Sequence, residues 1–84
     1  MSETRIGTVT HYFTDLQVAA VEIADGELHT GDMIHIKGHT SDFIQNVASM
    51  ELEHESTNVA KPGESVGIAM DEYTRVHDSV YVVH

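Results

Sequence analysis

The chain has 84 residues, no cysteine, and fourteen acidic residues against four basic ones, which gives a formal net charge of −10. This length allows a single domain, residues 1–84, with a modest core, and the missing cysteine excludes thiol chemistry and cysteine-based zinc sites. The negative charge disfavours bare nucleic acid and membrane surfaces as partners. No apolar run approaches the roughly 18 residues of a membrane helix, and the first residues lack a secretion signal. We therefore expect a soluble cytoplasmic protein.

The first two predicted strands form a hairpin. Residues 5–13 are rich in β-branched and aromatic side chains and have no helical period, which indicates a strand. Residues 14–17 turn the chain into a second strand, residues 18–24. Alternation in that strand places three apolar side chains on one face, and these are Ala19, Val21 and Ile23.

Residues 26–38 are predicted to form a barrel corner in which glycines mark the changes of direction. Gly31 tolerates a positive φ where the chain turns into the strand Met33–Lys37, and Gly38 ends that strand. Ile34 and Ile36 share one face, so this strand should be half-buried.

The longest extended candidate is residues 43–55, and its two halves differ in phase. Phe43 and Val47 share one face, whereas Ala48, Met50 and Leu52 share the other. A β-bulge near residues 46–49 would let both sets point inward, and an amphipathic helix is the competing interpretation. No convincing helix cap precedes the segment, so we favour the strand.

The final third predicts a turn and two strands. Pro62-Gly63 is typical of the centre of a type II turn, and the strand 65–70 follows it with Val66, Ile68 and Met70 inward. Gly67 marks a close approach of another backbone, and residues 79–83 form the last strand. Six short strands without a convincing helix predict a small all-β antiparallel barrel.

Two turn motifs carry a resemblance to a known family over nearly the whole chain. The first consists of Gly26, Leu28, Gly31 and Asp32, and the second of Ala60, Gly63, Glu64, Val66 and Gly67. Together they resemble the second domain of translational GTPases such as elongation factor Tu, which is a six-stranded Greek-key barrel. The chain is also similar to small free-standing versions of that domain, and to the C-terminal barrel appended to collagenase-like peptidases that act around RNA modification.

The resemblance implies a set of binding residues. In elongation factor Tu an acidic residue of the long strand lies over the terminal adenine of charged tRNA, and Glu51 falls at that place. Ser65, Gly67 and Ala69 fall in or near the same implied pocket, and Gly7 stands where the family has a flexible Gly-x-Gly. The chain departs from the family in a longer first hairpin and in His77, which replaces a glycine before the last aspartate.

The resemblance implies a non-enzymatic binding module. The chain has no Gly-x-x-x-x-Gly-Lys-Ser/Thr loop, so the GTPase half of the family is missing. We expect a monomer or weak dimer without a cofactor, which docks on a protein or ribonucleoprotein partner in a tRNA, ribosome-associated or RNA-modification assembly. Direct nucleic-acid binding stays open because of the net charge of −10.

Two alternatives remain open from the residues alone. Seven histidines could include a metal site built from His11, His35, His39 and His54, although their spacing follows no known ligand motif. The acidic surface could instead make the chain an adaptor for a basic protein. Catalysis has little support, since there is no Gly-x-Ser-x-Gly elbow.

Overall fold

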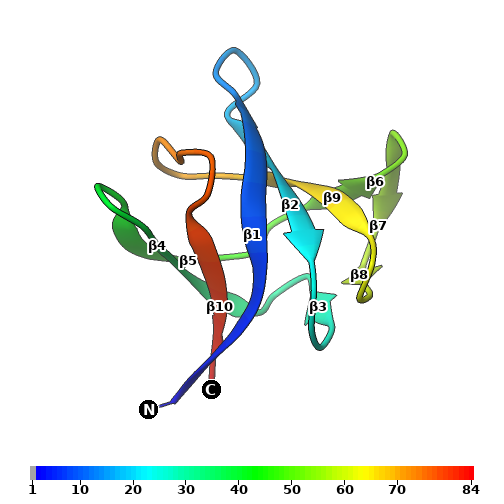
Figure 1. Cartoon of the computed structure of the whole chain (residues 1–84). Coiled ribbons are helices and arrows are strands. Elements are labelled where there is room, and N and C mark those ends of the chain that lie inside the picture. Colours follow the sequence, from blue (N-terminus) through cyan, green and yellow to red (C-terminus); the bar gives the residue numbers. More distant parts are fainter. Residues whose placement is uncertain (1) are drawn as a thin grey trace.

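The computed structural model describes residues 2–84, and all regular structure in this range is β-strand. Eight strands form one antiparallel sheet in the order β5-β4-β10-β1-β2-β9-β6-β7, and β3 pairs with β8 in a separate ladder. Figure 1 shows the large sheet curling round on itself. The strands are β1 (Glu3–Phe13), β2 (Val18–Ile23), β3 (Leu28–His29), β4 (Met33–Lys37), β5 (Asp42–Asn46), β6 (Met50–Leu52), β7 (Glu55–Thr57), β8 (Val59–Ala60), β9 (Ser65–Ala69) and β10 (Ser79–Val83).

The predicted small antiparallel all-β barrel is confirmed, although residues 2–84 form ten strands and not six, because short ladders such as β3-β8 and β6-β7 add to the predicted strands. Its core follows the alternation in the sequence. Ala19, Val21 and Ile23 of β2 are completely buried, and so are Ile34 and Ile36 of β4. The side chains predicted to point inward from the strand 65–70 are buried as well; these are Val66, Ile68 and Met70. Within residues 2–84 no helix has the length and apolar character needed to span a membrane.

The glycine turns have the backbone conformations that the sequence predicts. Gly31 has a φ of 92°, which explains why a residue without a Cβ precedes β4. Gly63 has a φ of 88°, and the amide of Glu64 donates a 3.0 Å hydrogen bond to the carbonyl of Lys61. Pro62-Gly63 therefore forms the predicted type II turn.

The segment 43–55 changes phase at a break in the strand, where a bulge was predicted. β5 ends at Asn46, and residues 47–49 have no regular structure before β6 begins at Met50. Val47 is held there by two backbone hydrogen bonds, one donated to Asp32 (2.9 Å) and one accepted from Gly31 (2.8 Å). Phe43, Val47 and Met50 all face the core, but the prediction that Ala48 points inward is wrong because the break leaves it exposed.

A buried glutamine joins β5 to the end of β9. Gln45 is only 4% exposed. Its Nε2 donates a 2.9 Å hydrogen bond to the carbonyl of Ala69, and its Oε1 accepts a 2.7 Å bond from the amide of Asp71. β5 and β9 are not neighbours in the sheet order, so this side chain links the two where the strand ladder does not.

The two ends of the described chain lie side by side. Figure 1 shows them together at one end of β1, opposite the tip that joins β1 to β2. The amide of His84 donates a 2.8 Å hydrogen bond to the carbonyl of Ser2, and β1 and β10 pair along this end.

Candidate functional site

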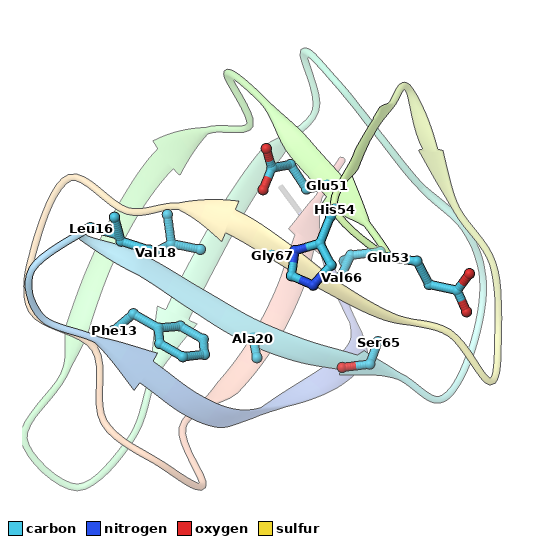
Figure 2. A pocket seen from close by; sticks show the side chains of 10 residues that line it. All are labelled: Phe13, Leu16, Val18, Ala20, Glu51, Glu53, His54, Ser65, Val66 and Gly67. Carbon is cyan, nitrogen blue, oxygen red and sulfur yellow. The ribbon is translucent and has the colours of Figure 1, made fainter.

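One depression on the surface is a groove with a volume of about 430 Å³. Three parts of the chain enclose it: the β1–β2 tip with the start of β2, the strand β9, and β6 with the turn that follows it (Figure 2). We call it the β9 groove. Its lining residues are Phe13, Leu16, Val18, Ala20, Glu51, Glu53, His54, Ser65, Val66 and Gly67.

Strand pairing explains why these residues meet. β9 lies between β2 and β6, and Gly67 is opposite Ala20 on one side and Glu51 on the other. A Cβ on Gly67 would lie 3.2 Å from a methyl group of Val18, so the missing side chain keeps this part of the groove open. The close neighbour at Gly67 is thus a side chain and not the backbone that the sequence predicts, since the nearest backbone atom, the carbonyl oxygen of Glu51, is 4.0 Å from this Cβ position.

A tight turn supplies one wall. β6 and β7 are joined by Glu53 and His54 alone, and both have a positive φ, 51° and 67°. Two-residue turns of this kind favour asparagine and glycine, so these two residues carry no recognisable turn signature. Figure 2 shows His54 lying over β9 beside Gly67 and Val66, whereas the carboxyl group of Glu53 points away from the groove.

A second depression of about 440 Å³ adjoins the β9 groove. It extends towards Ser49, Ser56 and Ala69, and both depressions are lined by Leu16, Val18, Glu51 and Gly67. Glu51 therefore belongs to the boundary between them.

The structure brings four of the five predicted binding residues into these two depressions. Glu51, Ser65 and Gly67 line the β9 groove, and Ala69 lines its neighbour. Gly7 lines neither, because it packs against β2 so closely that a Cβ would collide with the carbonyl oxygen of Glu22. Its placement indicates a packing role.

Sequence reasoning missed the apolar side of the groove. Phe13 and Leu16 are 45% and 70% exposed, and Val18 and Ala20 continue the same surface along β2. The available signal was an apolar residue before the predicted turn and another inside it. That these side chains meet His54 depends on the pairing of both β2 and β6 with β9.

The four histidines considered for a metal site do not converge. His11 packs on the ring of Phe13 with centroids 4.4 Å apart, His35 lies on β4, His39 lies in the β4–β5 turn, and His54 lines the groove. Among residues 2–84, no three His, Cys, Asp or Glu side chains are grouped so that they could hold a metal ion.

His35 instead forms a clamp on the outside of the barrel. Its Nδ1 contacts Glu3 of β1 at 2.7 Å, and its Nε2 contacts Asp42 of β5 at 2.5 Å. Both ring nitrogens donate only in the charged imidazolium form, so the clamp favours protonation. The hydrogen bond with Asp42, and then that with Glu3, raise the pKa of His35 above 6.5, against the opposing effect of burial. The same contact lowers the pKa of Asp42 below 3.8.

The clamp predicts a defined pH dependence of stability. A raised pKa means that the histidine contribution is fully present below pH 6.5 and is lost as the pH rises through the folded-state pKa. The aspartate contribution is lost as the pH falls through its lowered pKa. We expect the wild-type melting temperature to exceed that of His35→Gln by about 2–5 °C at pH 6, and by less at pH 8. Thermal unfolding of both proteins at the two pH values measures this difference. An equal difference at pH 6 and pH 8 would contradict it.

Comparison with known proteins gives a consistent set of relatives. No family model matches the chain. It is 34% identical over 79 residues to an uncharacterised protease of Methanocaldococcus jannaschii, which covers 93% of this chain and 19% of that protein. It is 38% identical over 80 residues to a collagenase of Porphyromonas gingivalis, covering 94% of the chain and 22% of the collagenase. The chain thus spans about a fifth of the length of these relatives.

A solved structure shows the same fold. The crystal structure of the C-terminal domain of a Geobacillus thermoleovorans protein assigned to the U32 peptidases superposes with a TM-score of 0.87 at 17% identity, covering 94% of this chain and 91% of that domain. The selenomethionine variant of the same domain gives a TM-score of 0.84. The resemblance to the barrel of collagenase-like peptidases is therefore supported.

These relatives correct the functional prediction. They are a protease, collagenases and a U32 peptidase domain, so the interpretation as a translation-factor docking module is wrong. Gly31 and Gly63 belong to the two motifs that carried that resemblance, and both occupy positive-φ corners that an antiparallel barrel needs whatever it binds. The cytoplasmic location, the single-domain extent and the oligomeric state stay predictions.

Proposed function

We propose that the chain is a non-catalytic accessory barrel that works with the catalytic part of a U32-type peptidase and binds protein through the β9 groove. The observation that carries this proposal is the extent of the similarity: more than nine-tenths of the chain matches about a fifth of a protease and of a collagenase. Most of the length of those relatives, and with it room for a catalytic part, lies outside the matched segment.

The groove itself supports a binding role. Ser65 and His54 both line it, but no hydrogen bond joins them in the described part of the chain. An activated serine needs an adjacent base that is itself oriented by a third group. The groove has a volume typical of ligand sites and exposes apolar side chains at its rim, which suits holding a chain segment.

A chimera tests the proposal. In the Porphyromonas gingivalis collagenase, the matched segment would be deleted or replaced by this chain. Cleavage of a protein substrate would then be measured for both altered collagenases and for this chain alone. We expect the deletion to lower the rate, the replacement to restore most of it, and the chain alone to cleave nothing. A folded chimera without restored activity would refute the accessory role, and cleavage by the chain alone would refute the non-catalytic one.

A further inference from the structure

We propose that the β9 groove binds an extended peptide segment in which a lysine or arginine stands beside a large apolar side chain. This inference rests on the proposed function as a protein-binding barrel, and it names the chemistry of the partner.

The negative charge around the groove favours a partner with a positively charged side chain. Its lining includes Glu51, Glu53 and no lysine or arginine. Among residues 2–84, neither glutamate takes part in a salt bridge, since all four ion pairs involve His29 or His35. Both glutamates are exposed, and Glu51 borders both depressions. A basic side chain entering from either depression would meet its carboxylate, and the net charge of −10 would steer that partner towards the chain.

The apolar part of the groove favours a large hydrophobic side chain next to that basic residue in the bound peptide. Leu16 is the most exposed large hydrophobic side chain in the described structure, at 70%, and Phe13 lies beside the same groove at 45%. Ala20 and Gly67 face each other across β2 and β9, so small residues leave room between these side chains and His54. An apolar side chain placed there would remove Leu16 and Phe13 from water, which is favourable in proportion to the area covered.

The same charges disfavour a nucleic acid in the groove. Phosphates would meet the carboxylate of Glu51 without a lysine or arginine in the lining to neutralise them. A protein segment is therefore the occupant that the groove selects.

Nuclear magnetic resonance titration of the full chain tests the proposal. The probes are three blocked pentapeptides: glycine-leucine-lysine-leucine-glycine, the same peptide with glutamate for lysine, and the same peptide with serine for both leucines. We expect amide shifts in residues 16–20, 51–54 and 65–67 with the first peptide, and much weaker shifts with the other two. Raising the salt concentration should weaken the first interaction.

Matched variants test separately the ionic and the apolar contribution to peptide binding. Glu51→Gln should weaken binding about two- to fivefold, the contribution of an exposed ion pair, whereas Glu72→Gln, an identical change at an exposed position outside both depressions, should not. Leu16→Ser should weaken binding, and Ile44→Ser, which removes an exposed side chain from β5, should not.

Three outcomes would overturn the inference. They are equal binding of the lysine and glutamate peptides, shifts confined to residues outside the groove, and shifts in the groove caused by a single-stranded RNA oligonucleotide instead of the first peptide. The chimera separates this inference from the proposed function. Peptide binding without restored cleavage would refute the accessory role alone, and restored cleavage without peptide binding would refute the peptide chemistry alone.

Discussion

Gly38→Ala should lower the free energy of unfolding by about 2–3 kcal/mol, the upper part of the range for overpacking a rigid interior site. Gly38 follows β4, and a Cβ there would collide with Oδ1 of Asp78 and lie 2.6 Å from its Cγ. Asp78 is only 3% exposed, and its Oδ2 accepts a 2.9 Å hydrogen bond from the amide of Arg75, so it cannot move aside freely. Urea unfolding monitored by circular dichroism measures the loss.

Two control variants separate the cost of a steric collision from the cost of an unfavourable backbone conformation. Gly31 has a φ of 92° but no atom within 4 Å of its would-be Cβ, so Gly31→Ala should cost only the left-handed backbone penalty, about 1–2 kcal/mol. Gly38 lacks a positive φ, so its cost should come from Asp78. In an Asp78→Ala background, Gly38→Ala should therefore cost much less. An unchanged cost in that background would show that the collision with Asp78 is not the cause.

Gln45→Met should lower the free energy of unfolding by about 1–3 kcal/mol, the cost of removing one partner from buried hydrogen bonds. Methionine has a similar shape, but it leaves the carbonyl of Ala69 and the amide of Asp71 without the partners they have at 2.9 Å and 2.7 Å. Because Gln45 connects strands that are not neighbours in the sheet, the loss should loosen the junction of β5 with the end of β9.

Hydrogen exchange locates this effect. The amide of Asp71 should exchange faster in Gln45→Met than in the wild type. Ile44 directly precedes Gln45 in β5, and its side chain is 53% exposed. Ile44→Met should therefore change neither the free energy of unfolding nor the exchange of the Asp71 amide appreciably. Unchanged protection of the Asp71 amide would mean that the glutamine does not join the two strands.

Local sequence patterns were sufficient to predict a strand and its buried face where only one face of the strand is buried. Ile34 and Ile36 alternate with polar residues, and that period of two fixed both the strand type and the buried face. Gly31 and Gly63 marked corners because their conformations exclude most other residues. These signals depend on a few neighbouring residues, so one sequence was enough to identify the barrel.

The parts that could not be predicted depend on distant partners. Residues 47–49 leave the strand because Val47 bonds to Gly31 and Asp32, which no local pattern shows. The Glu53-His54 turn has positive φ without glycine or asparagine, and His77 also has a positive φ, 78°. The groove combines β2, β6 and β9. The family resemblance identified three of its lining residues, Glu51, Ser65 and Gly67, and the apolar side of the groove was not predicted at all.

The adjacency of residues 2 and 84 has a mechanical consequence. Both lie at the end of β1 that is opposite the β1–β2 tip, and the β9 groove begins near that tip. The longest dimension of the molecule is 31 Å. A catalytic unit, a fluorophore or a sensor surface attached at either position would thus lie at the end of the barrel away from the β9 groove, and the groove would face outward. The barrel would work as a rigid spacer that presents its ligand at a fixed distance from whatever anchors it.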